Sequence, residues 1–236
     1  SIPGSIESMM IARVDRIPVQ ERKALKAASV YGQWFTLEMV NHLLNTSNIL
    51  FNAALASHLI RSENSGFIFT NSMLQEAIYS SYLSKQKKEL HDHAAIWYSG
   101  KDLMLEAQHL DRAENPKASE AYLRASENCR KRFDFSNGLL LVERGIELSQ
   151  EKLEKYQLIC LQAFMTREVG KPEHAIKLYN DAIKIINDKE HHCEAWVGIA
   201  ASNRWMGRGE ESSDILNKTE RIAKSKGLQL RLAQVG

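Results

Sequence analysis

The second half of the chain carries an internal repeat, and this repeat limits the possible folds more than any other feature. Gly170 and Gly207 lie 207 − 170 = 37 residues apart, and Phe133 lies 170 − 133 = 37 residues before the first of them. Around these points small and large residues recur at helical spacing: Tyr122, Ala125, Gly138 and Val142; Ala163, Ala175, Tyr179 and Ala182; Trp196, Ala200 and Leu216. Small residues let antiparallel helices approach closely, so the pattern predicts three stacked helical hairpins, at about 116–150, 153–188 and 190–225.

This spacing is near that of tetratricopeptide repeats, whose period is about 34 residues. Each copy here is three residues longer (37 − 34), and residues unusual for the pattern stand at Ser126, Gln162, Ser212 and Thr219. We therefore expect an irregular, tetratricopeptide-like (TPR-like) array. A connecting helical hairpin over Lys85 to Ala113 is expected ahead of it.

Short helices and one β-hairpin are expected in the first 84 residues. Helix-start residues stand at Pro3 and Ser5, at Pro18, at Thr36, and at Ser47 or Asn48. The turn Glu63-Asn64-Ser65-Gly66 separates Leu59–Arg61 from the aromatic run Phe67–Phe69 and predicts the hairpin. The predicted fold class is mainly α: a winged-helix-like domain at 1–84, preceded by a linker helix, and the connecting hairpin with the TPR-like repeats at 85–236. The segment Phe67–Tyr98 would join the two.

Two ordered blocks in the first hundred residues carry a family resemblance. The first is Ala12-Arg13-Val14-Asp15-Arg16-Ile17-Pro18 with Glu21-Arg22, Leu25, Ala27-Ala28, Val30, Gly32 and Phe35; the second is Phe69, Leu74, Glu76-Ala77, Tyr79, Leu90-His91 and Ala94-Ala95. They resemble the region that follows the nucleotide-binding domain in signal-transduction ATPases with numerous domains (STAND), which are AAA-like. One departure is Asn71, where that family often has histidine.

The resemblance implies a regulatory function. In the STAND family this region is a winged-helix arm that relays nucleotide state, and tetratricopeptide-like helices follow it. The expected function is a non-catalytic protein-interaction arm of a multidomain signalling ATPase, with an adenylate or guanylate cyclase as the output domain. The alternative is the same arm in a LuxR-type transcriptional regulator or a hybrid kinase. The expected partners are a protein or peptide ligand on the repeats and the ATPase domain upstream in the same chain.

The charge balance argues against direct nucleic-acid binding. Lys and Arg number 31 against 29 Asp and Glu, a formal net charge of +2. The candidate recognition helix, Asn48 to Leu59, contains no Lys or Arg, and the hairpin offers only Arg61 against Glu63. The denser basic groups, Lys85-Lys87-Lys88 and Arg130-Lys131-Arg132, are more typical of solvated helix faces than of a phosphate track.

No catalytic, metal or cofactor site is expected in the sequence. No GxxxxGK[ST] phosphate-binding loop occurs among the glycines. His91 and His93, like the neighbours His191 and His192, lack the i,i+3 or i,i+4 spacing that helical metal ligands need, and His109 stands apart. Cys129, Cys160 and Cys193 are odd in number and widely spaced, which favours reduced thiols and a cytoplasmic location. The longest apolar stretches are too short to span a bilayer, so no membrane partner is expected.

Candidate binding residues fall in two groups, each of which could also be ordinary packing or solvated surface. Tyr122, Tyr156 and Arg167 are candidates for the groove of the repeats. Candidates for interdomain contacts are Met9, Met10, Arg13, Asp15, Arg16, Trp34, Tyr79 and His91. An exposed salt bridge is the simpler alternative for Asp15 with its neighbouring arginines.

Overall fold

The computed structural model describes residues 4–225, which contain thirteen helices and three short strands. The chain divides into two compact units, Ser1–Asn115 and Pro116–Gly236. The expectation of a mainly helical fold, with a small sheet in the first part and a helical-hairpin array in the second, is confirmed. Among the helices described, none combines the length and apolar character that a membrane crossing needs.

The first unit contains seven helices and the sheet. In chain order these are α1 (Gly4–Val14), α2 (Val19–Tyr31), β1 (Trp34–Phe35), α3 (Leu37–Leu44), α4 (Asn52–Ala56), β2 (Ile60–Glu63), β3 (Gly66–Phe69), α5 (Ser72–Ser80), α6 (Ser84–Tyr98) and α7 (Leu103–Arg112). Thr36 caps α3 as expected, because its hydroxyl accepts a hydrogen bond from the Met39 amide at 3.2 Å. Gly32 ends α2 with φ of +110°, a conformation that glycine adopts without strain.

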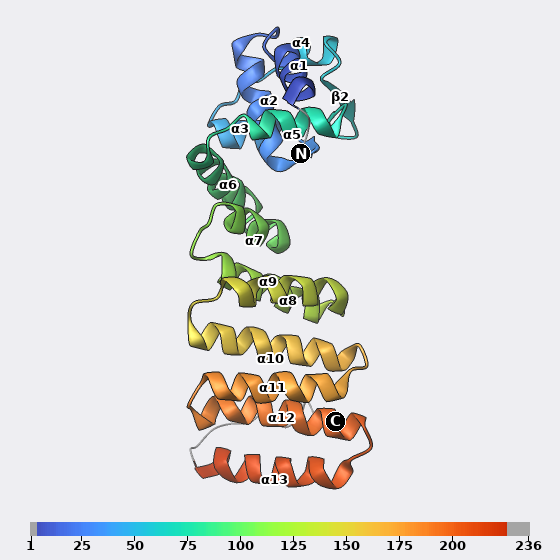
Figure 1. Cartoon of the computed structure of the whole chain (residues 1–236), viewed down its shortest axis with the longest axis vertical. Helices are drawn as coiled ribbons and strands as arrows, with labels where there is room; N and C mark the ends of the chain where they lie inside the picture. The colour runs from blue at the N-terminus through green and yellow to red at the C-terminus, as the bar shows by residue number, and fades with distance from the viewer. Residues whose placement is uncertain (1–3, 226–236) are drawn as a thin grey trace. The chain divides into compact units, whose positions relative to one another are not determined.

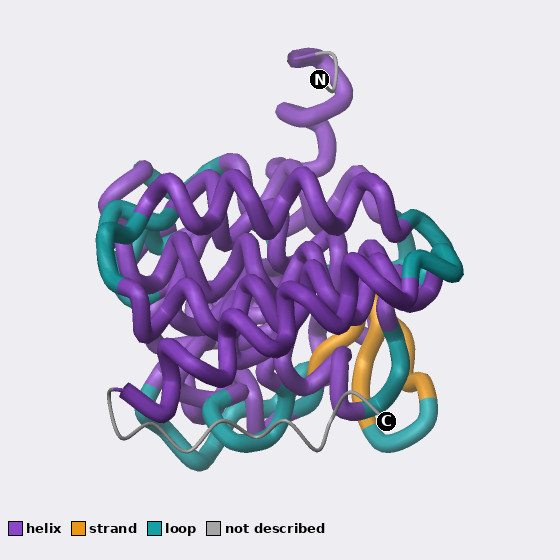
Figure 2. Tube along the Cα trace, turned by 90° about the horizontal axis from the view of Figure 1, so that it is seen from below, coloured by secondary structure: helices purple, strands orange, loops and turns teal. Residues whose placement is uncertain are grey.

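The sheet has three antiparallel strands in the order β1-β3-β2 (Figure 2, orange). The predicted hairpin is present, with Ile60 opposite Phe69 and Glu63 opposite Gly66. The third strand, β1, was not predicted: it pairs Phe35 with Phe67 and is two residues long, too short to show an alternating pattern. Gly66 allows close approach here, since a Cβ atom at this position would lie 2.6 Å from the Phe35 carbonyl oxygen.

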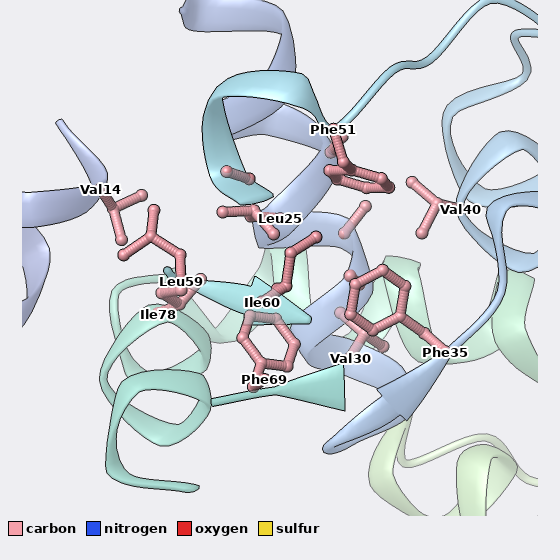
Figure 3. Close-up of a cluster of buried hydrophobic side chains, with 14 of the residues drawn as sticks. Val14, Leu25, Val30, Phe35, Val40, Phe51, Leu59, Ile60, Phe69 and Ile78 are labelled. Carbon is pink, nitrogen blue, oxygen red and sulfur yellow. The ribbon is translucent and has the colours of Figure 1, made fainter. Parts of the chain in front are cut away.

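Aromatic and aliphatic side chains of α1 to α6 and of the three strands meet in one core (Figure 3). Phe35 is fully buried, and its ring centroid lies 5.6 Å from that of Phe51 and 5.3 Å from that of Phe69. Leu25 and Val30 of α2 also pack into this core. The sheet and the short helices therefore depend on one shared hydrophobic cluster.

Helix α4 begins in a way that was not predicted. The expected caps, Ser47 or Asn48, lie before its start, and the residue at the cap position is Phe51, whose side chain accepts no capping hydrogen bond. The carboxylate of Glu21 on α2 takes that role: its oxygens accept from the amides of Ala53 at 3.1 Å and Ala54 at 2.8 Å. A residue 32 positions away in the chain thus satisfies the first turn of α4.

The second unit consists of three consecutive helical hairpins (Figure 1). They are α8 (Ala118–Lys131) with α9 (Phe135–Leu148), α10 (Lys152–Glu168) with α11 (Pro172–Ile185), and α12 (Lys189–Trp205) with α13 (Gly209–Ser225). The three turns contain Phe133, Gly170 and Gly207, all with positive φ, at +58°, +82° and +75°. The 37-residue spacing read from the sequence therefore marks one structural position in each hairpin.

Small residues bring the helices of the repeats together. Gly198 on α12 lies against the ring of Tyr179 on α11, and a Cβ atom there would be 2.2 Å from Cζ. Ser126 and Thr219, unusual for the tetratricopeptide pattern, are buried, and their hydroxyls donate to the carbonyl oxygens of Tyr122 and Ile215 four residues earlier in the same helix. A buried hydroxyl at these positions is therefore satisfied without a partner from another helix.

Helices α6 and α7 belong to the first unit, whereas the sequence grouped residues 85–115 with the repeats. The reason lies in the inward face of α6, where His91, Ala94 and Ala95 are buried and the helix contacts α2 and α3. That face packs against the preceding domain rather than leading away from it.

Candidate functional site

The first helices of the three hairpins, α8, α10 and α12, are neighbours in the second unit, because α10 contacts both of the others. On this row two guanidinium groups lie near the ring of Phe164: that of Arg130 on α8 is 5.5 Å from the ring centroid, and that of Arg167 on α10 is 4.9 Å from it. Each arginine also has a carboxylate partner, Glu127 at 2.8 Å for Arg130 and Glu168 at 2.7 Å for Arg167. An aromatic ring that contacts two cations is the most distinctive chemistry of the row.

The three groove candidates lie deeper than expected. Tyr122 and Tyr156 are only 5% and 0% exposed, and the Tyr156 hydroxyl donates to the carbonyl oxygen of His191. Arg167 is also buried, but its guanidinium is held on Phe164 and Glu168. Buried tyrosines cannot line an open groove, so Tyr122 and Tyr156 pack the repeats; Arg167 is the candidate that belongs to the charged row. Phe164 was missed, although it lies three residues before Arg167 in the same helix, a spacing that puts both on one face.

The acidic residue Glu194 on α12 completes the charge pattern of this row. Its pKa is raised, first by the loss of hydration around the carboxylate and then by the negative charge of Glu127. His191 and Arg130 act in the opposite direction. The row thus mixes both signs of charge and does not form a uniform basic track.

The interdomain candidates near the start of the first unit are mostly open to solvent. Met9 and Trp34 are 60% and 41% exposed, whereas Met10 packs partly against the core. Asp15 pairs with Arg22 at 3.0 Å, an exposed salt bridge, instead of with Arg13 or Arg16. The other two charges point elsewhere: Arg13 donates to the Ser57 carbonyl oxygen at 3.3 Å, and Arg16 is exposed.

Tyr79 and His91, the remaining candidates, meet in a polar cluster within the first unit, in which His91 and His109 are buried and Tyr79 is half-buried. The Tyr79 hydroxyl lies 2.8 Å from Nε2 of His91, and Nδ1 of His91 lies 2.8 Å from Nδ1 of His109 on α7. Only one Nδ1 atom can carry the shared hydrogen, because the bond needs one donor and one acceptor. If His91 donates through Nδ1, its Nε2 accepts from Tyr79; the other tautomers reverse both bonds. The chain of three groups therefore has two self-consistent arrangements.

Aromatic rings and burial keep both histidines neutral. Tyr98 stacks on His109 at 5.3 Å between ring centroids, and Tyr31 meets the same ring edge-on at 5.9 Å. Loss of hydration, with the charge of Arg112 adding to it, lowers the pKa of His91 to about 4 and that of His109 to about 3. This Tyr79–His91–His109 cluster is therefore uncharged at neutral pH, and it ties α5, α6 and α7 together. His109 carried no sequence signal as a partner of His91, since the two are 18 residues apart.

No metal-binding group of three or more His, Cys, Asp or Glu residues occurs within residues 4–225. A shallow, open depression lies beside the ends of α10 and α11, with Lys152, Lys184 and His191 on its rim. Two of these three have carboxylate partners: Lys184 pairs with Asp181 at 2.7 Å and His191 with Asp188 at 2.8 Å. Nothing in this depression points to catalysis.

Comparison with known proteins identifies a fold but no family. No family model and no curated protein match the chain. Its fold matches a STAND protein. This solved structure is the signal transduction ATPase with numerous domains with a tetratricopeptide repeat sensor from Pyrococcus horikoshii; the TM-score is 0.62 over 91% of this chain, at 16% identity. The chain spans 33% of that protein's length. A second structure, MamA (AMB-1), has a TM-score of 0.44 at 16% identity over 70% of this chain and 88% of its own.

At 16% identity the first likeness shows the fold alone. It extends over both units, since it covers 91% of the chain. The combination of a small mixed helical unit and tetratricopeptide-like hairpins therefore occurs in a STAND protein of known structure.

Proposed function

We propose that the chain is a non-catalytic regulatory and protein-interaction arm of a multidomain signalling ATPase. The repeats bind a protein or peptide. The first unit couples ligand binding on the repeats to the nucleotide state of the ATPase domain of the same protein. The observation that carries this proposal is the match of both units together to a STAND protein with a tetratricopeptide repeat sensor. The sequence blocks around Arg13 and Tyr79 support it independently.

In this proposal the first unit is a winged-helix-like domain. The order of α2, β1, α3, α4 and the β2–β3 hairpin, with the strand order β1-β3-β2, supports that assignment. It acts as a protein-contact module and not as a DNA reader: α4 contains no Lys or Arg, and Arg61 of the hairpin is paired with Glu63 at 2.9 Å. The exposed side chains of Met9, Arg16 and Trp34 face the ATPase domain.

The output of the parent protein is an adenylate or guanylate cyclase in this proposal, and the arm works in the cytoplasm. A LuxR-type regulator or a hybrid kinase is the alternative output. The three cysteines are free, with Cys160 and Cys193 buried, which supports a reducing compartment. The arm itself needs no cofactor.

The Tyr79–His91–His109 cluster supports a role for α5 to α7 as a stiff link in the relay. The His91–His109 hydrogen bond is buried and the Tyr79–His91 bond is half-buried, and polar networks of this kind fix one packing arrangement only when every member is satisfied. Weakening this link should change how nucleotide state is passed on, without removing the ligand-binding repeats.

The test is ATP turnover and output activity of the parent protein, with and without residues 116–225. We expect deletion to change turnover by roughly fivefold, the lower range of coupling between sites, and Tyr79→Phe in the intact parent to reduce the response to ligand. Turnover that is the same in both forms would refute the relay. ATP hydrolysis by the pure 236-residue chain would contradict the non-catalytic assignment, and tight, steeply salt-dependent DNA binding would favour a DNA reader instead.

A further inference from the structure

Phe133 occupies a position where the other two repeats have glycine. In each hairpin the turn is closed by the same hydrogen bond: Asp134 N–H to Cys129 O at 2.9 Å, Lys171 N–H to Thr166 O at 3.1 Å, and Arg208 N–H to Asn203 O at 3.0 Å. The residue before each donor has a positive φ, which glycine adopts without strain at a helix end. Phe133 adopts the same conformation, at +58°, and for a bulky residue this costs free energy.

The packing of the Phe133 side chain offsets little of the free energy that its positive φ costs. Phe133 is 79% exposed, the largest exposed fraction among the exposed large hydrophobic side chains in the described chain. Its ring makes one edge-to-face contact, with Phe135 at 6.0 Å between centroids. A strained residue that contributes little to the core is a candidate for binding, because strain of this kind persists where it serves a function.

The residues around Phe133 carry unpaired positive charge. Lys131 and Arg132 are exposed and form no ion pair within residues 4–225. Glu127 pairs with Arg130 at 2.8 Å, whereas the Asp134 carboxylate accepts from the neutral Asn137 Nδ2 at 2.8 Å and keeps its charge. The turn therefore presents one aromatic ring beside two cations that form no ion pair, and the charges of Lys131, Arg132 and Asp134 sum to 2 − 1 = +1.

An aromatic series links this turn to the charged row of the first helices. Phe135 contacts both Phe133 and Phe164, the latter at 6.2 Å between centroids. Phe164 in turn contacts the guanidinium groups of Arg130 and Arg167. We call Lys131, Arg132, Phe133, Phe135 and Phe164 the Phe133 edge.

We propose that the Phe133 edge is a docking surface for an acidic protein segment that carries an apolar side chain or pocket for the Phe133 ring. This inference rests on the proposed protein-binding function of the repeats and names the chemistry of one partner. The carboxylates of the segment pair with Lys131 and Arg132, and the exposed ring loses its contact with water. The complementary charge supplies selectivity, and the aromatic ring is the anchor.

Two other partners fit this edge less well. Single-stranded nucleic acid is bound by several stacking rings along a basic groove, whereas here one exposed ring stands beside a row in which Arg130 and Arg167 already have carboxylates. A membrane surface is bound by an amphipathic helix with a broad apolar face, whereas the exposed ring of Phe133 stands in the turn between α8 and α9.

The experiment measures binding to the purified chain by fluorescence anisotropy with two peptide libraries. Both have one fixed leucine, flanked by Asp and Glu in one library and by Lys and Arg in the other. We expect the acidic library alone to bind. Phe133→Asn should weaken that binding by about tenfold or more, since asparagine keeps the backbone conformation and removes the ring. Lys131→Glu with Arg132→Glu should abolish it, and Phe133→Tyr should retain it.

Two controls separate loss of binding from loss of folding. Phe133→Asn should leave Tm unchanged or raise it by about 2–4 °C, because strain is relieved. Leu140→Ala, at an exposed apolar site on α9 in the same hairpin, should bind like the wild type. Acidic peptides that bind equally to Phe133→Asn would overturn the Phe133 edge and leave the protein-binding function standing. Binding of neither library, or tighter binding to anionic phosphatidylserine vesicles or to an oligothymidine strand, would also overturn the proposal.

Discussion

The two units of this protein differ in how far their polar side chains reach along the chain for hydrogen-bond partners. In the first unit the decisive hydrogen bonds join distant parts of the chain: Glu21 caps α4 across 32 residues, and Gln75 donates to the Ser29 carbonyl oxygen across 46. In the repeats, the buried hydroxyls of Ser126, Ser202 and Thr219 bond within their own helices, four residues back. The longer bonds there stay within one hairpin, from Ser119 to the Gly145 carbonyl oxygen, or reach the next hairpin, from Tyr156 to the His191 carbonyl oxygen. The first unit is therefore expected to unfold as a whole, whereas the stability of the repeats is a sum over neighbouring hairpins.

The largest effect should come from the aromatic core of the first unit. Phe35→Ala removes a fully buried ring that contacts Phe51, Phe67 and Phe69, and such truncations cost about 3–5 kcal/mol. Hydrogen exchange should show lost protection throughout the first unit and retained protection in α8 to α13. Leu50→Ala, exposed in the same unit, is the control with little effect. An equal loss of protection in both units would contradict the expectation that the first unit unfolds independently of the repeats.

A smaller and local effect is expected from Gly198→Ala in the repeats. The new methyl group would collide with the buried ring of Tyr179, and overpacking of this kind costs about 1–3 kcal/mol. Protection should fall in α11 and α12 and stay near the wild-type level in α8 and α9. Gly209→Ala, with open space around it, should be neutral. Uniform loss across all three hairpins would contradict the nearest-neighbour picture.

A fall in pH should change the stability of the two units in opposite directions. The pKa of His91 is about 4 in the fold against 6.5 unfolded, so below pH 6.5 the unfolded state takes up a proton that the fold excludes. Stability is therefore lost as pH falls from 6.5 towards 4, by about 2 kcal/mol at pH 5 from His91 alone. In the repeats, the raised pKa of Glu194 acts the other way, because protonation of that group favours the folded state.

Hydrogen exchange at pH 7 and pH 5 measures this difference. The first unit should lose protection in acid, and the variant His91→Gln with His109→Gln should be less sensitive to pH, although less stable at pH 7. A first unit whose stability does not change between these pH values would show that the cluster is hydrated.

The smallest effect is expected for Ser126→Ala. The hydroxyl bonds only to the Tyr122 carbonyl oxygen of its own helix, and alanine is the more favourable helix residue, so the change should lie within about 0.5 kcal/mol. Chemical denaturation measures it. A loss above about 1 kcal/mol would show that the Ser126 hydroxyl stabilises more than its own helix.

The same contrast explains what the sequence could reveal. Repeats are local, so the spacing of Phe133, Gly170 and Gly207 was enough to place the three turns. The strand β1, the capping of α4 by Glu21 and the pairing of His91 with His109 depend on contacts between distant residues, and no local pattern encodes those. Thr36 was predictable as a cap because its partner, the Met39 amide, is three residues away.

The candidate site was harder to predict than the fold. Tyr122 and Tyr156 have hydroxyl groups and large rings, which suit a groove as well as a core, and only tertiary packing decides between them. Phe133 was aligned with the two glycines, but its exposure and the unpaired charges beside it depend on where Glu127 and Asp134 direct their carboxylates. The type and spacing of residues therefore placed Phe133 in the turn but did not indicate that it is exposed and could bind a partner.

The capping of α4 by Glu21 also bears on the order of folding. A helix of five residues is too short to persist alone, so α4 can form only when α2 has been brought to it and the intervening loop has closed. Each repeat needs only a short turn to close. We expect the hairpins to form early and α4 to form late, after the folding barrier of the first unit. The Glu21→Gln variant should therefore unfold faster and fold at the wild-type rate. Slower folding would show that α4 forms before the barrier, against the expected order. In the expected order, the repeats complete their hairpins before the first unit completes its core.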